Sequence, residues 1–376
     1  MKMVPLGDIL QEYKLNPLQN EDLPVLTLTE KNGFVYQKDR FNKRLATEDT
    51  STYKVVRPMS LAFNPYLLWA GALAQNTGDE SGIISPLYPT FNVKNTYDPA
   101  YIYRLLLTPE MIQRYDSIAY GSVPRRRRSS VKDFLSLQIP TPPPLDEQRR
   151  IAAILDKADA IRQKRRQVIV HLDSLAQSIF QRMFGSSSKR AKLGAIFEVS
   201  TGSTPSRANP ANFGGGIPWV KTGEVDGTIT TTEETVSRAG VRSSRLTLFP
   251  PKSIIIAMYG QGKTRGQSAI LGLHATTNQA CAVLPPNDNY YPEFIQTQLR
   301  SGYERLRGAA RGGNQANLNL QIIRDFEVTV APLELQAQFA AVLSEINRSK
   351  SRAKTALDKS RALFESLQSR AFRGEL

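Results

Sequence analysis

The chain has 376 residues, 40% of them hydrophobic, and a formal net charge of +15, and its length alone favours two or more domains over one hydrophobic core. No apolar stretch reaches the roughly 18 residues of a membrane span, and charged residues interrupt the N-terminal segment, so we expect a cytoplasmic protein that uses no membrane. The positive charge indicates a polyanionic partner without distinguishing DNA from RNA.

The first domain is expected at residues 1–142. A run of four arginines near its end lies between a Gly/Pro turn and the strand-like segment that leads to Pro140, which predicts a short cationic loop. Such a run is often only a solvated surface, but arginine is also the side chain that makes bidentate contacts to guanine. The candidates for DNA contact are Arg125, Arg126, Arg127 and Arg128.

A long helix and a linker are expected at residues 143–188. The helix opens after Pro144 and then runs without proline or internal glycine as far as Gly185. At 1.5 Å per residue this is a rod of about 60 Å. Apolar side chains recur at alternating steps of three and four, the spacing of a coiled-coil seam. Gly185 and the three serines after it predict a flexible linker. The seam residues are Ile151, Ile154, Ile161, Val168, Leu172, Leu175 and Ile179.

The second domain is expected at residues 189–330. Strand-like runs at 253–258, 280–284 and 326–330 alternate with Gly- and Pro-rich segments, which predicts a mixed α and β domain with long loops. The single cysteine, Cys281, excludes an intrachain disulfide, and with only two histidines in the chain it cannot build a Cys/His zinc site. We expect Cys281 to be a buried small residue and the chain to bind no metal.

Residues 257–264 nearly spell the phosphate-binding loop of nucleotide-binding proteins, although Ala257 stands where that loop has its first glycine. Such a loop needs a helix after it, whereas residues 265–272 predict a turn and a short strand. We interpret the segment as a tight basic turn that lies against DNA phosphates or base edges. The candidates for DNA contact in this part of the domain are Lys221, Tyr259, Gln261, Lys263 and Arg265.

A second basic segment, rich in amides, is predicted at residues 305–317, shortly before the next rod. Arginine, asparagine and glutamine are the side chains that pair with guanine and adenine edges. Both domains carry such a segment at the same topological position, which favours a DNA interface over a solvated surface in each. The candidates are Arg307, Arg311, Asn314 and Gln315.

A second rod is expected at residues 331–376, and it repeats the first at an offset of 188 residues: Pro144, Leu145 and Gln148 recur as Pro332, Leu333 and Gln336. The fold class predicted is α+β: two mixed α/β recognition domains, each followed by a long helix, with the helices paired as an antiparallel coiled coil in a pseudo-twofold repeat. Two unrelated surface helices, each packed on its own domain, are the alternative. We expect Arg165 to pass the small Ala353 and reach solvent. The second seam comprises Phe339, Val342, Ile346, Leu363 and Leu367.

The duplicated layout resembles the specificity subunits of type I restriction-modification enzymes. The residues that carry the resemblance are the proline-rich lead-in and helix start at 139–153, the C-terminal 367–376, and the segments 202–205 and 217–220. Leu335 departs from the family pattern, which has glutamate there. The resemblance implies two target-recognition domains, one for each half of a bipartite duplex DNA site. It also implies two methyltransferase subunits as partners, and restriction subunits, with S-adenosylmethionine, ATP and Mg bound by those partners.

We expect this chain to be non-catalytic and to bind no cofactor of its own. Residues 64–66 resemble the motif that holds a flipped base in DNA amino-methyltransferases, but the second proline and the glycine fingerprint for the methyl donor are missing. No Ser/His/Asp set or nuclease-like carboxylate cluster stands out. The alternatives are a DNA enzyme that depends on ATP or S-adenosylmethionine, and a tandem RNA-binding adaptor.

Overall fold

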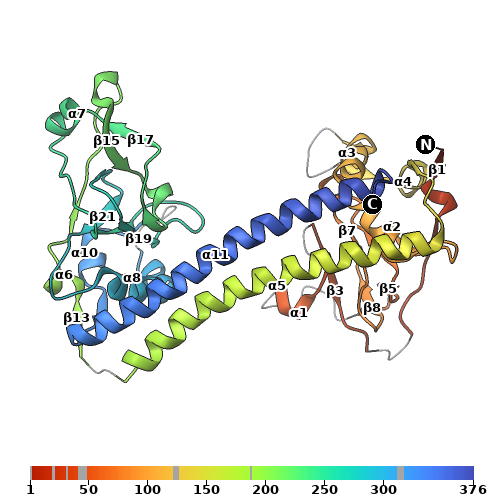
Figure 1. Cartoon of the computed structure of the whole chain (residues 1–376), viewed down its shortest axis with the longest axis horizontal. Helices are drawn as coiled ribbons and strands as arrows, with labels where there is room; N and C mark the ends of the chain where they lie inside the picture. The colour runs from red at the N-terminus through yellow and green to blue at the C-terminus, as the bar shows by residue number, and fades with distance from the viewer. Residues whose placement is uncertain are drawn as a thin grey trace. The chain divides into compact units, whose positions relative to one another are not determined.

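The computed structural model describes residues 2–18, 22–30, 33–40, 49–121, 127–186, 189–310 and 317–376. The chain divides into two compact units. Unit 1 comprises Met1–Arg165 and Ala356–Leu376, and unit 2 comprises Arg166–Thr355. Each unit therefore contains one globular part and a portion of each of the two long helices, which Figure 1 shows in yellow-green and blue.

The two predicted rods are helices α5 (Leu145–Phe184) and α11 (Leu333–Phe372), each of 40 residues. Both begin directly after a proline, whose fixed φ suits the start of a helix. They pair antiparallel, as predicted: Phe180 packs on Phe339 with ring centroids 5.4 Å apart, and Lys350 forms an ion pair with Asp173. The predicted fold class is confirmed.

The seam between the rods differs from the predicted one at five of the twelve expected positions. Leu155, Leu357 and Phe364 are buried, although they were not expected in the seam. Leu155 and Phe364 follow the expected positions Ile154 and Leu363 by one residue, and both join the hydrophobic core of unit 1. The buried stripe therefore turns away from the pure heptad line. Five expected seam residues are exposed instead: Ile161 (49%), Val168 (46%), Leu175 (45%), Val342 (39%) and Leu363 (56%).

The other expected seam residues lie at least partly inside. Ile151, Phe339 and Ile346 are buried, whereas Ile154, Leu172, Ile179 and Leu367 are half-buried. The expectation that Arg165 passes Ala353 and reaches solvent is wrong. Arg165 is half-buried, and its guanidinium donates to the carbonyl oxygen of Ala356 and to the hydroxyl of Ser360. These two acceptors lie three and seven residues beyond Ala353 along α11.

Unit 1 is built on a four-stranded antiparallel sheet in the order β2-β9-β6-β7. Its central strands carry Phe63 and Phe91, which pack with Phe134 in one aromatic core. The sheet strands are β2 (Leu10–Tyr13), β6 (Leu61–Phe63), β7 (Leu73–Gln75) and β9 (Thr90–Val93). The helices are η1 (Leu6–Asp8), α1 (Gln37–Arg40), η2 (Leu68–Ala70), α2 (Pro99–Leu106), α3 (Pro109–Ser117) and α4 (Val131–Ser136).

Four two-stranded ribbons complete unit 1, all of them antiparallel. They pair β1 (Met3–Pro5) with β12 (Gln138–Pro140), β3 (Leu26–Thr29) with β4 (Gly33–Tyr36), β5 (Lys54–Val56) with β8 (Gly82–Ile84), and β10 (Ala119–Tyr120) with β11 (Arg128–Ser129).

Unit 2 is built on a five-stranded sheet in the order β14-β21-β18-β19-β16, in which only β16 and β19 are parallel. The three expected strands are present as β18 (Ile254–Ala257), β21 (Cys281–Leu284) and β22 (Glu327–Thr329). Cys281 is fully buried, as expected. The other sheet strands are β14 (Ser200–Thr201), β16 (Gly227–Ile229) and β19 (Ser268–Leu271).

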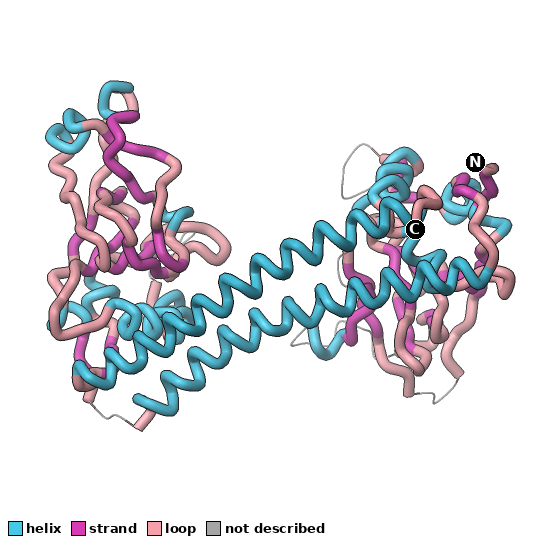
Figure 2. Tube along the Cα trace, in the orientation of Figure 1, coloured by secondary structure: helices cyan, strands magenta, loops and turns pink. Residues whose placement is uncertain are grey.

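A second, three-stranded sheet of unit 2 has the order β17-β15-β20, and β13 pairs with β22 (Figure 2). These strands are β13 (Arg190–Lys192), β15 (Phe213–Val220), β17 (Glu234–Val236) and β20 (Thr276–Thr277). The helices are α6 (Leu193–Ile196), η4 (Pro210–Asn212), η5 (Thr222–Glu224), α7 (Arg238–Ser243), α8 (Pro292–Ser301), α9 (Tyr303–Gly308) and α10 (Leu320–Arg324).

The sequence repeat is a repeat of structure. The strand order β2-β9-β6-β7 of unit 1 corresponds to β14-β21-β18-β19 of unit 2, and the ribbon β1-β12 corresponds to β13-β22. The repeated glutamines take the same role: the side-chain oxygen of Gln148 accepts from the N–H of Asp98, and that of Gln336 accepts from the N–H of Tyr291. Each long helix is thereby joined to the first turn of α2 or α8.

Candidate nucleic-acid interface

The two basic segments and two hairpin loops meet at equivalent places in the two units. The β6–β7 loop of unit 1 corresponds to the β18–β19 loop of unit 2, because these strand pairs are equivalent in the sheet order. The chain that follows each basic segment bonds to that loop: Ser129 N–H donates to the carbonyl oxygen of Pro65, and Leu318 N–H donates to that of Met258. In each unit, the residue that follows the basic segment is thus bonded to one hairpin loop.

The β18–β19 loop presents three candidate side chains to solvent. Tyr259 is 43% exposed, and Gln261 and Lys263 are exposed. Gly260 and Gly262 have φ of 138° and 59°, in a region that favours glycine. The loop is therefore a tight turn whose side chains project outward, as the sequence predicted. It leads into β19 and not into a helix, so it lacks the helix N-terminus on which a nucleotide-binding loop depends.

Helix α9 holds this loop in place through two side chains. The hydroxyl of Tyr303 donates to the carbonyl oxygen of Lys263 at 2.7 Å. Arg307 donates to the carbonyl oxygen of Arg265 at 2.8 Å and to the hydroxyl oxygen of Tyr303 at 3.0 Å. Arg307, which the sequence suggested as a DNA contact, therefore positions the loop through its backbone. Tyr303 was missed, although its spacing of four from Arg307 on one helix face is a signal for such a pair.

In unit 1 the equivalent loop is shaped by Asn64. Its side-chain oxygen accepts from the N–H of Tyr66 at 3.0 Å, and its amide donates to the hydroxyl of Tyr88 at 3.1 Å. This Asx turn explains the asparagine of residues 64–66 by local structure. Arg128 lies over the Tyr66 ring at 5.7 Å and is exposed, so its guanidinium and the ring form one surface.

Of the other arginines in the run, Arg127 is described by the structure and is engaged within unit 1. Arg127 pairs with the carboxylate of Asp116 at 2.6 Å and also donates to the carbonyl oxygens of Asp116 and Ala119. It therefore fixes the end of α3, and Arg128 is the exposed member of the pair. The other candidates of the two basic segments lie outside the described residues: Arg125, Arg126, Arg311, Asn314 and Gln315.

Lys221 is engaged within unit 2. Its ammonium group lies 2.9 Å from Glu233 and 2.9 Å from Glu234. Arg207 pairs with Glu234 at 2.7 Å, and hydrogen bonds from Arg207 and Lys221 lower the pKa of Glu234 to about 2. Two carboxylates thus balance the positive charge of Lys221 within unit 2, and its role as a DNA contact stays a prediction.

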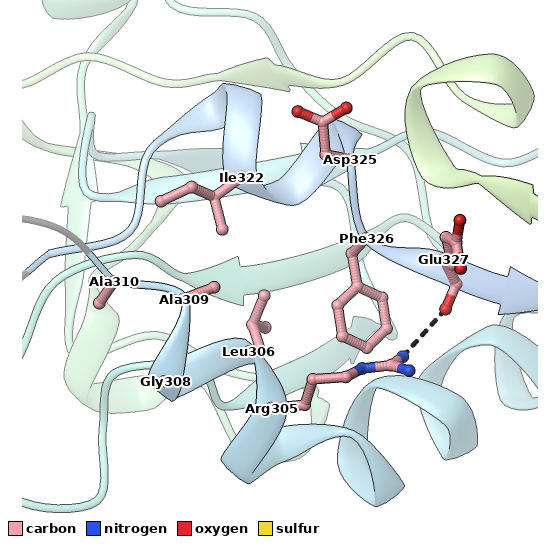
Figure 3. A pocket seen from close by; sticks show the side chains of 9 residues that line it. All are labelled: Arg305, Leu306, Gly308, Ala309, Ala310, Ile322, Asp325, Phe326 and Glu327. Carbon is pink, nitrogen blue, oxygen red and sulfur yellow. Dashed lines mark hydrogen bonds between the residues drawn. The ribbon is translucent and has the colours of Figure 1, made fainter.

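An open hollow of about 580 Å³ adjoins helix α9 on the side of α10 (Figure 3). Arg305 crosses its floor, stacked at 4.4 Å on the ring of Phe326 and donating to the carbonyl oxygen of Glu327 at 3.0 Å. Asp325 lies at its rim and pairs with Lys192. Arg305 therefore fastens α9 to the strand β22, and through α9 it supports the Tyr303 and Arg307 contacts.

Among the described residues, no group of three or more His, Cys, Asp or Glu side chains could hold a metal ion. In the same part of the chain, no helix is long and apolar enough to cross a membrane. Burial raises the pKa of the Cys281 thiol to about 12, with a smaller contribution from Glu224. Cys281 is the first residue of β21 and is fully buried beside β18, so its thiol is a packing group rather than a nucleophile.

Residues of unit 2 and of helix α11 resemble known proteins in sequence. Residues 186–359 match the model of the type I restriction modification DNA specificity domain. The chain is 27% identical over 161 residues to the specificity subunit of the Escherichia coli type I restriction enzyme EcoR124I/EcoR124II and to that of the Methanocaldococcus jannaschii enzyme MjaIX. These matches cover 41% of this chain and 40% and 36% of the two relatives, so the chain spans less than half the length of the curated relatives it matches.

Two solved structures resemble nearly the whole chain, each with a TM-score of 0.58 and 15% identity. One is the specificity subunit of a type I restriction-modification system from M. genitalium, with 99% of this chain and 96% of that chain covered. The other is a chain from a structure that describes complex assembly and conformational transition of a type I system, with 100% and 98% covered. At this identity the likeness concerns the fold.

Proposed function

We propose that this chain selects the DNA target of a type I restriction-modification complex, because residues 186–359 match the model of the type I restriction modification DNA specificity domain and the whole chain resembles the fold of a specificity subunit. In this proposal each unit binds one half of a bipartite duplex site. The paired rods α5 and α11 set the number of base pairs between the halves.

The observation that carries the proposal is the duplicated interface. Each unit brings a hairpin loop and a basic segment together through a backbone hydrogen bond, from Ser129 to Pro65 or from Leu318 to Met258. A duplicated protein surface fits a target with two separate specific blocks, as dimeric DNA-binding proteins do with their half-sites. The exposed side chains Gln261, Lys263 and Arg128 include the types that bind base edges and phosphates.

We further propose that the chain is a non-catalytic scaffold. It would join two methyltransferase subunits and the restriction subunits, and S-adenosylmethionine, ATP and Mg would be bound by those partners. This part of the proposal rests on the family, and DNA as the ligand implies a cytoplasmic location. The turn at residues 257–264 gives no support to an ATP-dependent activity of the chain itself, because the strand β19 follows it.

Selection of bound duplexes from a random library by the purified full chain tests the proposed function. We expect enrichment of two short sequence blocks separated by a fixed, unselected gap, and no cleavage or methylation by the chain alone. A single continuous block, or equal binding of RNA and DNA duplexes without any selected sequence, would contradict the proposal and favour the RNA-binding adaptor.

A further inference from the structure

Unit 2 carries a lobe that has no counterpart among the described residues of unit 1. It lies between the equivalent strands β14 and β18 and contains β15, β17, η4 and α7. Figure 1 shows β15, β17 and α7 on the side of unit 2 away from its portions of α5 and α11. In unit 1 the corresponding insertion, between β2 and β6, forms the ribbon β3-β4 and the strand β5 instead. The lobe is therefore a specialised part of unit 2.

The acidic residues of this lobe neutralise only some of its cations. Glu233 and Glu234 pair with Lys221 and Arg207. Glu224 accepts hydrogen bonds from the backbone N–H groups of Lys221 and Glu233. These three carboxylates are therefore engaged at the base of the β15–β17 ribbon, and they are not available to balance the charge of α7.

Helix α7 and the residue after its C-cap Ser244 carry three exposed arginines, Arg238, Arg242 and Arg245. None of the three forms an ion pair with a residue that the structure describes. Arg238 and Arg242 are four residues apart and share one face of the helix. We name this group, Arg238, Arg242 and Arg245, the α7 arginine surface.

Gly240 and Ser237 hold α7 in place, and the backbone conformation of Arg245 indicates a use for the surface. Gly240 packs so closely on the preceding 3-10 helix that an added Cβ would lie 2.3 Å from the carbonyl oxygen of Asn212. The hydroxyl of Ser237 caps α7 and donates to the carbonyl oxygen of Ala211 at 2.6 Å. Arg245 has φ of 50°, a conformation in which glycine or asparagine is favoured at the end of a helix. An arginine at that position is less stable than a glycine would be, and a role of its charge in binding explains its presence there.

We propose that the α7 arginine surface binds the phosphate backbone of duplex DNA beside the half-site that unit 2 reads. This inference rests on the proposed function and assigns its parts: the β18–β19 loop discriminates bases, and α7 supplies affinity that does not depend on sequence. Three guanidinium groups on a helix held in place, without an ion pair among the described residues, suit phosphate oxygens, which arginine can bind bidentately. Hydrophobic partners are less suited, because the surface presents charge and not an apolar face.

Salt-dependent DNA binding by the full chain tests this inference. The charge-removed variant is Arg238→Gln, Arg242→Gln and Arg245→Gly combined, and Arg245→Gly alone is a second variant that relieves the positive φ. The matched control removes three exposed cations from the rods of unit 2, by Arg166→Gln, Arg352→Gln and Lys354→Gln. Dissociation constants are measured from 50 to 300 mM salt for a selected duplex, a scrambled duplex and an RNA duplex.

We expect the triple variant to lose affinity for the selected and scrambled DNA duplexes equally. Each lost phosphate contact should weaken binding about eightfold at 0.1 M salt and lower the slope of log K against log salt by about 0.9. Arg245→Gly should give about one third of the change in slope without lowering the melting temperature. The control should behave as the parent.

An unchanged slope in a folded triple or single variant would overturn the inference, as would an equal loss in the rod control or a loss confined to the RNA duplex. The ratio of selected to scrambled binding by the parent reports on the proposed function separately. A parent without sequence preference would contradict the proposed function, whereas the change in slope would still decide whether α7 binds DNA phosphates.

Discussion

The side-chain oxygen of Gln336 accepts a hydrogen bond from the backbone N–H of Tyr291 at 3.0 Å, and Gln148 makes the same bond to Asp98 at 2.9 Å. Both glutamines are almost fully buried, with exposed fractions of 0% and 2%. In each unit the start of a long helix is thereby tied to the first turn of the helix that packs beside it. This is why the glutamine recurs in the two halves of the sequence.

Replacing Gln336 by alanine should destabilise unit 2. The side chain also donates to the carbonyl oxygen of Ala331 at 2.8 Å, so the substitution leaves buried backbone groups without partners, at a cost of about 1–3 kcal/mol. Gln338, exposed on the same helix, is the control, and Gln338→Ala should change stability by less than about 0.5 kcal/mol. Denaturant unfolding of the full chain measures both. Equal effects at the two positions would contradict the role of Gln336.

Replacing Tyr303 by phenylalanine should loosen the β18–β19 loop without unfolding unit 2. Only the hydrogen bond to Lys263 and the acceptor for Arg307 are lost. We expect faster amide hydrogen exchange at residues 260–266 and about tenfold weaker discrimination at one half-site, equivalent to about 1.4 kcal/mol. Tyr120→Phe removes a hydroxyl from an exposed tyrosine of unit 1 and serves as the control. Unchanged exchange in the loop would show that Tyr303 does not position it.

Substitutions in the two units should affect separate half-sites. Lys263→Gln should weaken or relax recognition of the block that unit 2 reads, and Arg128→Gln should do so for the other block. A lost bidentate base contact costs about 1–3 kcal/mol, whereas a lost phosphate contact weakens all sequences alike. Binding to duplexes altered in one block at a time separates these effects. Loss at both blocks from one substitution, in a folded protein, would argue against independent recognition.

The Cys281 thiol should resist modification in the folded chain. Its pKa is raised by burial to about 12, so at pH 8 almost none of it is the reactive thiolate. A raised folded pKa stabilises the protein below the pKa of the unfolded thiol, about 8.5, and this contribution is lost as the pH rises from there toward about 12. We expect no reaction with a thiol reagent at pH 8 and one thiol per chain after denaturation. Rapid labelling of folded protein would contradict the burial.

Local signals account for what the sequence predicted well. Helices α5 and α11 begin after Pro144 and Pro332 and continue through long stretches without proline or internal glycine. The effect of these residues on a helix is local, so the sequence alone predicts it. The seam was predicted less well, because the burial of Leu155 and Phe364 depends on the globular parts packed beside the rods. A heptad pattern describes contact between two helices and carries no information about a third surface.

The candidate interface shows the same division. Exposed charge in a basic segment is visible from composition, but the partner of each charge is not. Lys221 is neutralised by two glutamates in the folded lobe, and Arg307 holds a loop that lies about 40 residues earlier in the chain. Nothing in the sequence singles out Arg238 and Arg242, and only the fold shows that they form no ion pair with the part of the chain that the structure describes.

The central claim, that two recognition units are spaced by the paired rods, is tested most directly by mapping methylated adenines in cells that carry the chain with its partner subunits. The parent is compared with a variant in which four alanines follow Arg165 in α5 and four precede Ala356 in α11. Both rods are lengthened because both contribute to both units. Four residues add about 6 Å and slightly more than one full turn, about 1.1 turns, which keeps the helix faces close to their original alignment. Four residues inserted at the exposed Asp79 are the control.

For the parent and the control we predict one methylated motif of two short blocks around a fixed gap. For the lengthened variant we predict the same two blocks with a gap longer by about two base pairs, at about 3.4 Å each. A parent motif of one continuous block, or a lengthened variant that keeps the parent gap while methylating DNA, would contradict the account.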